Sequence, residues 1–174
     1  MAQVFIQPSY GTPEARRYGA ATLDNLVPFT DAGHADLLAP ADLARLTAVH
    51  PSGSARFWGA TAKHDRRMDT VATGDVVLLT GRKHVLAVGE VGHGFRDPGF
   101  ARRLWDPAPG KCVWGNVYSL RGYWPVRLPY EAIWALPGFT VGDNFMGLRF
   151  LDAEKSAAVL ALVAPETVRS PEPS

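Results

Sequence analysis

The middle of the chain, residues 56–128, is a series of short apolar runs separated by turn-forming residues, and this pattern restricts the possible folds more than any other feature. The runs Asp75–Thr80 and Val85–Val91 are rich in β-branched residues, and the link Gly81–His84 between them has hairpin length. The long crossover helices that parallel neighbouring strands require are missing between the runs. The segment therefore predicts a small barrel rather than a parallel α/β sheet.

Further elements are expected after these two strands. A third strand is predicted over Val113–Leu120 and a fourth over Tyr123–Leu128, with short helices over 100–105 and 129–136. Asp152 is a suitable N-cap for a final helix. The predicted fold class is α+β, a small barrel with flanking helices.

The first third of the chain has the pattern of helices. Thr12 is a typical N-cap, Pro13 occupies the first helical position, and Pro28 is expected to end this helix. The positions expected on its inner side are Ala15, Tyr18, Ala21, Thr22 and Leu26. A second helix is predicted from Pro40 to the residue before Pro51.

Three regions follow from this pattern. Residues 1–55 are expected to form a helical N-terminal extension packed on the barrel, and residues 56–163 the barrel domain itself. Residues 164–174 are polar and proline-rich, which is typical of an exposed linker or tail. A linker at this position suggests that a further segment follows it.

The composition is that of an ordinary globular protein. The 174 residues are enough for one domain with a proper core, and the single cysteine, Cys112, excludes an internal disulfide and a zinc cluster built on cysteines. No apolar run approaches the roughly 18 residues of a membrane span. The N-terminus lacks a basic region and a cleavage site, so no signal peptide is predicted. We expect a cytoplasmic protein with no membrane partner.

Positive charge is concentrated in the middle of the chain. The net charge is only +1, but Arg56–Lys111 holds ten Lys and Arg against six Asp and Glu, a net of +4. The rest of the chain holds eight against eleven, a net of −3. This distribution favours one basic face on a nearly neutral protein. An evenly solvated surface with a chance cluster is an equally good interpretation of the charge alone.

The sequence shows little sign of catalysis. Its five histidines show no metal-ligand spacing, and it has neither a phosphate-binding loop nor a nucleophile elbow. Asp65 and Asp69 are one helical turn apart with two arginines between them, which is more typical of a solvated face than of an acid–base pair. The sequence predicts a binding protein with no metal and no cofactor.

The aromatic residues are more informative. Trp58 is followed by Gly59 and Ala60 at the end of a predicted strand, and Trp114, Asn116 and Tyr118 fall on one face of another by alternation. Glycine beside an aromatic ring lets a ligand approach the backbone, and rings can stack on a flat base. This pattern indicates an aromatic pocket for a single base. Each tryptophan taken singly is more often part of the core.

Basic residues lie in the predicted loops around the strands. At one end of a barrel such loops would contact phosphates while a base enters the mouth. For any single arginine, ordinary surface solubility is the better interpretation. The residues expected to contact a nucleic-acid backbone are Lys63, Arg66, Arg67, Arg82, Lys83, His84, Arg96, Arg102 and Arg103.

Three segments together resemble a known group of proteins. Arg56–Gly59, Thr73–Leu79 and Ala87–Val91 are similar in order and composition to strands of the PUA-like superfamily, in particular its EVE and YTH-like branch. Arg103–Leu120 and the opening Val4–Gly11 resemble the N-terminal domain of bacterial modification-dependent HNH endonucleases. The resemblance extends to about residue 163.

This resemblance implies a PUA-like barrel that reads modified DNA, namely 5-methylcytosine in a duplex, by flipping the base into an aromatic cage. Trp58 and Trp114 would be the cage walls, and the polar-tipped loop Gly142–Gly147 would supply a hydrogen bond to the Watson–Crick edge of the base. The resemblance also implies a C-terminal nuclease domain after the tail, which the chain does not include, as a partner that would carry cleavage. The full set of expected pocket residues is Trp58, Gly59, Ala60, Trp114, Asn116, Tyr118, Asp143, Asn144 and Phe145.

Two other functions are left open by the residues. One is an RNA-binding reader of a modified base on the same YTH or EVE-like barrel, which should prefer single-stranded RNA. The other is a small RNA-processing hydrolase that uses Lys63, His64 or His93.

Overall fold

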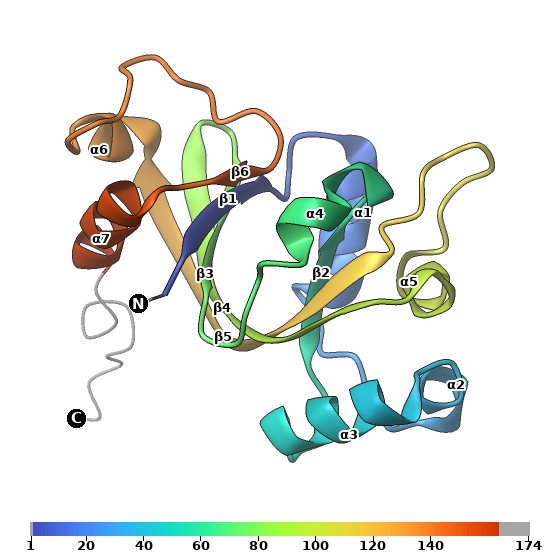
Figure 1. The fold of residues 1–174 in the computed structure, drawn as a ribbon. Coiled ribbons are helices and arrows are strands. Elements are labelled where there is room, and N and C mark those ends of the chain that lie inside the picture. Colours follow the sequence, from blue (N-terminus) through green and yellow to red (C-terminus); the bar gives the residue numbers. More distant parts are fainter. Residues whose placement is uncertain (1, 164–174) are drawn as a thin grey trace, which may run out of the picture.

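A six-stranded sheet forms the centre of the molecule (Figure 1). The computed structural model describes residues 2–163. Its strands lie in the order β2-β5-β4-β3-β1-β6. In chain order the elements are β1 (Val4–Pro8), α1 (Pro13–Thr22), α2 (Ala32–Ala35), α3 (Pro40–Val49), β2 (Arg56–Ala60), the 3-10 helix η1 (Ala62–His64), α4 (Asp65–Met68), β3 (Val76–Gly81), β4 (His84–Arg96), α5 (Pro98–Trp105), β5 (Asn116–Pro129), α6 (Tyr130–Trp134), β6 (Arg149–Phe150) and α7 (Ala153–Leu162).

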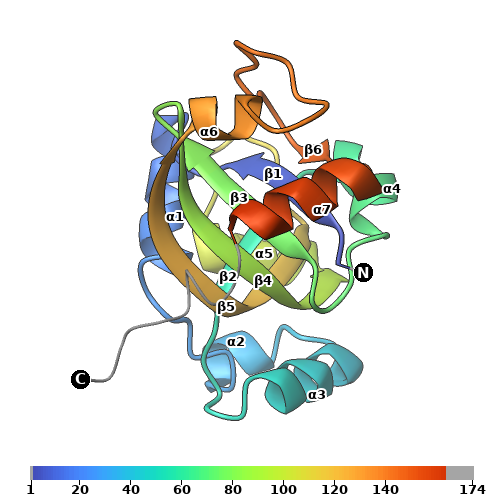
Figure 2. The same cartoon turned by 90° about the vertical axis from the view of Figure 1, so that its left-hand side faces the viewer.

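The sheet curls into a half-barrel (Figures 1 and 2). Its two longest strands, β4 and β5, have 13 and 14 residues and pair antiparallel with three shifts in register. Such irregularities bend a strand and increase its twist, so a long strand can follow a curved surface. β1 pairs parallel with β3, and the other pairs are antiparallel. The predicted α+β fold class is confirmed: a curled, mixed half-barrel sheet with flanking helices.

The β3–β4 hairpin turns as the sequence predicts. Arg82 and Lys83 have φ values of 53° and 57°, the left-handed conformation that a two-residue type I′ turn requires at both central positions. Tyr130 N donates a hydrogen bond to the Lys83 carbonyl at 3.1 Å, which attaches the start of α6 to this turn.

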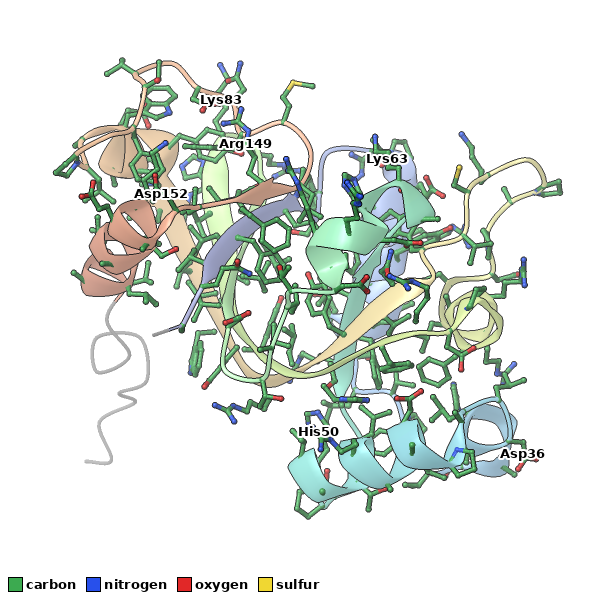
Figure 3. All side chains as sticks on the ribbon, in the orientation of Figure 1. Asp36, His50, Lys63, Lys83, Arg149 and Asp152 are labelled. Carbon is green, nitrogen blue, oxygen red and sulfur yellow. The ribbon has the colours of Figure 1, made fainter. Side chains whose placement is uncertain are left out.

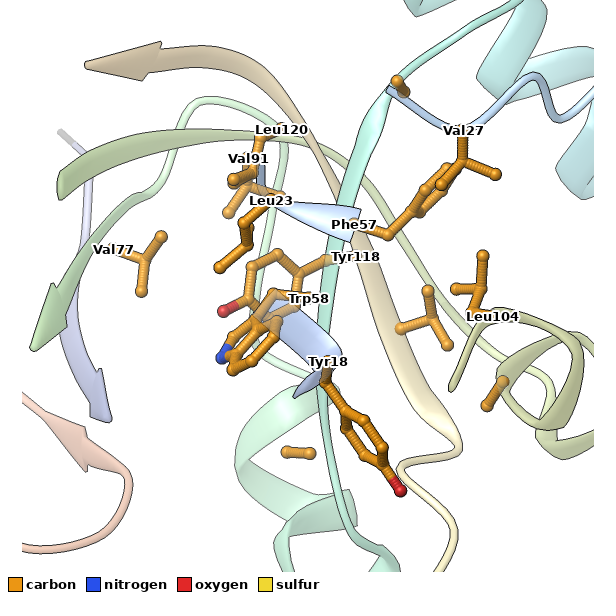
Figure 4. Close-up of a cluster of buried hydrophobic side chains, with 14 of the residues drawn as sticks. Tyr18, Leu23, Val27, Phe57, Trp58, Val77, Val91, Leu104, Tyr118 and Leu120 are labelled. Carbon is orange, nitrogen blue, oxygen red and sulfur yellow. The ribbon is translucent and has the colours of Figure 1, made fainter. Parts of the chain in front are cut away.

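Two hydrophobic cores lie on opposite faces of the sheet. Alternation along β1 directs Phe5 into the first core, part of which Figure 4 shows, and Val4 and Ile6 into the second. α6 and α7 contribute Ile133 and Val159 to the second core. Both faces of the sheet are covered at β1 and β3, so these two strands are buried at nearly every position.

Three details differ from the sequence analysis. The first third is not wholly helical, because Val4–Pro8 forms β1 in the sheet. α1 ends at Thr22 rather than at Pro28, which leaves Leu26 55% exposed. The expected third and fourth strands are the single strand β5, because the strand continues through Arg121 and Gly122 with a shift in register and without a turn. The tail, residues 164–174, lies outside the described residues.

The other predicted helices are confirmed. Thr12 and Asp152 are N-caps whose side-chain oxygens accept from Ala15 N at 3.1 Å and from Lys155 N at 2.8 Å. α3 begins at Pro40 as expected. None of the helices in residues 2–163 is long and apolar enough to cross a membrane.

A buried polar cluster attaches α3 to the sheet. His50, directly after α3, hydrogen-bonds through Nε2 to Ser119 Oγ of β5 at 2.8 Å, and His93 N donates to the same oxygen at 2.9 Å. His93 Nε2 in turn contacts Asp42 Oδ1 of α3 at 2.9 Å. Burial lowers the pKa of His50 below its usual 6.5, and the charge on nearby His93 lowers it further.

The first prediction concerns this cluster. Unfolded His50 takes up a proton below its ordinary pKa of 6.5, whereas folded His50 resists protonation, so stability is present above that pH and is lost as pH falls through the folded pKa. We expect the free energy of unfolding, measured by urea denaturation, to fall between pH 7.5 and pH 5. His50→Gln should reduce that slope. The matched control His84→Gln, on the hairpin surface, should leave it unchanged, and an identical slope in His50→Gln would contradict the assignment.

Candidate nucleic-acid interface

One glutamine of β1, the strand next to the edge strand β6, connects this side of the curled sheet to the opposite edge strand β2. Gln7 of β1 donates from Nε2 to the carbonyl of Gly59 in β2 at 2.5 Å, and its Oε1 accepts from the Tyr118 hydroxyl at 2.7 Å. All three residues are buried. Burial raises the pKa of Tyr118 well above 10, so its hydroxyl stays a neutral donor. Gln7 thus holds the ends of β1 and β2 at a fixed separation.

A pocket of about 400 Å³ opens where these strands end. The volume lies within the range of pockets that bind small molecules. The pocket is bounded by the β1–α1 connection and the first turn of α1 on one side, and by the β2–η1 connection on the other. Its lining residues are Gln7, Pro8, Gly11, Thr12, Glu14, Ala15, Gly59, Ala60, Thr61, Lys63, His64, Trp114, Gly147 and Leu148.

Trp114 is the aromatic wall of this pocket. Its ring is half-buried and meets the rings of Tyr18 and Trp58 edge-on, with centroids 4.7 and 5.0 Å away. Trp105 lies behind it at 5.7 Å. Packing against three rings holds the Trp114 indole in place at the pocket wall. The expected position of Trp114 in a pocket therefore agrees with the geometry.

Trp58 and Tyr118 occupy the core instead. Both are 0% exposed, and they face each other as a cross-strand pair of β2 and β5. The Trp58 indole nitrogen has no hydrogen-bond acceptor within residues 2–163. A ring without exposed surface cannot stack on a base unless the core opens, so the expected second wall is corrected here to a supporting ring behind Trp114.

Gly59 and Ala60 line the pocket, and Gly59 must be glycine. A Cβ at this position would lie 2.7 Å from the Asn116 carbonyl and 2.9 Å from the Trp105 ring. Asn116 does not line the pocket. Its buried amide donates to Thr61 O at 3.0 Å and to Asp65 Oδ1 at 2.7 Å, so it positions the β2–α4 connection.

The loop that includes Asp143, Asn144 and Phe145, which was expected to line the pocket, has a structural role instead. The Asp143 carboxylate accepts two hydrogen bonds from Arg149, at 2.7 and 2.9 Å, and the Arg149 contact lowers the Asp143 pKa. Phe145 is buried, and Asn144 is exposed. None of these three expected residues lines the pocket, whereas Gly147 and Leu148 of the same segment do.

α1 brings polar groups to the pocket that the sequence pattern does not predict. Glu14 lines it, and its Oε1 accepts from the Tyr18 hydroxyl at 2.9 Å. Burial and this hydrogen bond raise the pKa of Tyr18 to about 12, so the hydroxyl stays a donor to the carboxylate. In the sequence, the run Thr12–Pro13–Glu14 predicts only the start of a helix.

Basic side chains gather at the pocket end. Figure 3 shows Lys63, Lys83 and Arg149 at this end, with His50 and Asp36 at the opposite one. The ion pairs found within residues 2–163 do not involve Lys63 or Lys83, which are both exposed.

Further expected phosphate contacts surround these lysines. Arg66 and Arg67 are exposed on α4, and Arg82 donates to the Tyr10 hydroxyl at 2.8 Å. His84 Nδ1 contacts the Arg82 carbonyl at 2.7 Å. The pKa of His64, on the pocket wall, is lowered by burial and by Lys63 and Arg67.

Three of the expected phosphate contacts are placed differently. Arg96 pairs with Asp65 and Asp69 at 3.2 and 2.7 Å, which explains the two carboxylates as a structural network. Arg103 lies near His34, whose pKa it lowers after the larger effect of burial, and so points toward α2. Arg102 lines a neighbouring cavity of about 440 Å³ that also includes Lys63.

A comparison with solved structures identifies the fold. The structure matches the N-terminal domain of Thermococcus gammatolerans McrB bound to m5C DNA, with a TM-score of 0.66 over 92% of this chain and 96% of that chain, at 16% sequence identity. The chain shares the fold of this McrB domain. No family model matches the sequence. No curated protein matches it.

The described residues, 2–163, contain no group of side chains suited to bind a metal ion. Within residues 2–163, no three His, Cys, Asp or Glu side chains are grouped so that they could hold a metal ion. The polar side chains that line the pocket are those of Gln7, Thr12, Glu14, Thr61, Lys63 and His64. Such groups can recognise a ligand by hydrogen bonds.

Proposed function

We propose that this chain reads 5-methylcytosine in double-stranded DNA, and that it is a binding domain rather than an enzyme. The modified base flips out of the duplex into the pocket beside Trp114. The observation that supports this most is the pocket itself: it has one rigid aromatic wall and it opens at the end of the molecule that carries free lysines. The McrB domain with the same fold is described as bound to m5C DNA.

The energetics of base flipping suit such a pocket. Flipping a base requires a few kcal/mol for unstacking and unpairing, and stacking on an aromatic ring returns about 1–3 kcal/mol. Burying the 5-methyl group adds about 0.8 kcal/mol, which corresponds to roughly a four-fold preference. The methyl group therefore contributes moderate selectivity, and the remaining affinity must come from hydrogen bonds and phosphate contacts.

Glu14 is the residue that we assign to recognition of the cytosine edge. An ionised carboxylate accepts hydrogen bonds only, and the exocyclic N4 amino group of cytosine is a donor. Thymine carries the same 5-methyl group but has the acceptor O4 in place of N4. The Tyr18 hydroxyl, 2.9 Å from Glu14 Oε1, holds the carboxylate on the pocket wall.

Phosphate contacts supply the general affinity. Lys63 and Lys83 are exposed and free of ion pairs within residues 2–163, and α4 adds Arg66 and Arg67. These contacts release counterions, so binding should weaken steeply as salt rises. Cleavage, in this proposal, belongs to a separate nuclease domain.

The second prediction tests the proposal directly. We expect the wild-type chain to bind a duplex with 5-methylcytosine several-fold more tightly than the same unmodified duplex, measured by fluorescence anisotropy at fixed salt. With the base placed opposite an abasic site, 5-methylcytosine should be preferred over thymine by about ten-fold or more, because O4 faces the Glu14 carboxylate. Glu14→Gln should abolish that preference, since an amide can donate to O4.

Placing both bases opposite an abasic site removes the difference in pairing strength between them. Asp24→Asn, an exposed change outside this pocket, is the matched control and should bind as wild type. Equal affinity for modified and unmodified duplex would refute the proposed function. An unchanged base preference in Glu14→Gln would refute only the role of Glu14.

A further inference from the structure

The segment between α6 and β6 presents two large apolar side chains to solvent. Val141 is 78% and Met146 is 77% exposed, the highest values for large hydrophobic side chains in residues 2–163. Single exposed apolar residues are common on protein surfaces. Val141 and Met146 differ from such residues because their loop is held by hydrogen bonds and lies beside the pocket.

The loop is held in a defined conformation. Asp143 Oδ1 accepts from Phe145 N at 2.9 Å, and the Asp143 carbonyl accepts from Trp134 Nε1 of α6 at 2.8 Å. Arg149 holds the same carboxylate from the other side. Phe145 adopts a φ of 47°, a conformation that is unfavourable for a bulky residue, and its buried ring packs against Tyr130 at 4.9 Å. With its neighbour Phe145 anchored inward, Met146 is left facing solvent.

The exposed methionine lies beside the pocket. Its neighbour Gly147 lines the pocket together with Leu148. Arg67 of α4 donates to the Leu148 carbonyl at 3.5 Å, which links the loop to the basic helix. Figure 1 shows the loop at the same end of the molecule as α4 and the β1–α1 connection. An apolar, unpaired side chain thus adjoins the pocket mouth on the proposed DNA-binding end.

We propose that Met146 is a wedge that enters the DNA base stack and occupies the gap left by the flipped base. This inference rests on the proposed function, because it requires that a base leaves the duplex. An inserted apolar side chain replaces the lost stacking on the neighbouring bases. The unbranched thioether of methionine adapts to such an irregular space.

The third prediction separates opening of the duplex from general binding. Met146→Ala should weaken binding to a duplex with a paired 5-methylcytosine by about ten-fold, because the opened stack is left unfilled. With 5-methylcytosine opposite an abasic site, where little pairing has to be broken, the variant should bind within about two-fold of wild type. Affinity is measured by fluorescence anisotropy, and thermal melting confirms that the variant is folded.

Leu37→Ala is the matched control, since Leu37 is 44% exposed beside α2 at the opposite end. It should leave both affinities unchanged, and Met146→Leu should retain most of the binding. Wild-type affinity of Met146→Ala for the paired duplex overturns the wedge, and so does an equal loss on both duplexes. If the wild-type chain itself shows no preference for 5-methylcytosine, the proposed function fails instead.

Discussion

Replacing Trp114 by alanine is expected to weaken binding of a 5-methylcytosine duplex by about 10- to 100-fold, because the stacking surface of the flipped base is lost. Stacking on an aromatic side chain is worth about 1–3 kcal/mol per base. Trp114 is half-buried, lines the pocket and is held by Tyr18 and Trp58. Isothermal titration calorimetry with the modified duplex measures the loss.

Controls separate this loss from a defect in folding. Trp124→Ala removes another half-buried tryptophan, one that packs against the second core away from the pocket, and should bind DNA as wild type if folded. Trp114→Phe keeps an aromatic face and should retain much of the affinity. A folded Trp114→Ala chain that binds with wild-type affinity would exclude Trp114 as the pocket wall.

Trp58→Ala is expected to lower the free energy of unfolding by about 3–5 kcal/mol, the usual loss for a large aromatic residue removed from a core. Trp58 is 0% exposed and its ring supports Trp105 and Trp114, with centroids 6.3 and 5.0 Å away. A loss of this size is a large part of the stability of a typical domain, so the variant should be partly unfolded at 37 °C. Urea denaturation followed by circular dichroism measures it.

Trp58→Phe tests the supporting role without emptying the core. The Trp58 indole nitrogen makes no hydrogen bond within residues 2–163, so phenylalanine loses only volume and should be much milder than alanine. The folded Trp58→Phe chain should bind modified DNA within a few-fold of wild type. Binding as weak as that of Trp114→Ala would show that Trp58 touches the base after all, and full stability of Trp58→Ala would contradict its place in the core.

Local signals predicted most of the secondary structure. Thr12 and Asp152 mark helix starts because a side-chain oxygen can satisfy a free backbone amide, whatever surrounds the helix. The link Gly81–His84 predicted its hairpin because its length allows only a tight turn. β1 was missed because its main partner, β3, lies about 70 residues further along the chain and pairs with it in parallel.

The candidate site depends on tertiary structure to a much greater extent than the secondary structure does. No local pattern indicates that Gln7 and Glu14 share a site, and they meet at the pocket only because the sheet curls and α1 follows β1 directly. Asp143 and Arg149 are six residues apart in sequence, and only the folded loop shows that the carboxylate is neutralised.

The two tryptophans expected in the aromatic pocket show what the sequence alone determines and what the tertiary structure decides. The sequence by itself determined an α+β barrel with tryptophans on its strands and basic residues in its loops, because alternation and turn chemistry are local properties. Only the tertiary structure decided that Trp58 is core and Trp114 is pocket wall. Trp58 and Trp114 each precede a glycine, but their exposure differs. Trp58 lies within β2, where this strand pairs with β5, whereas Trp114 lies just before β5 begins, at the end of the sheet.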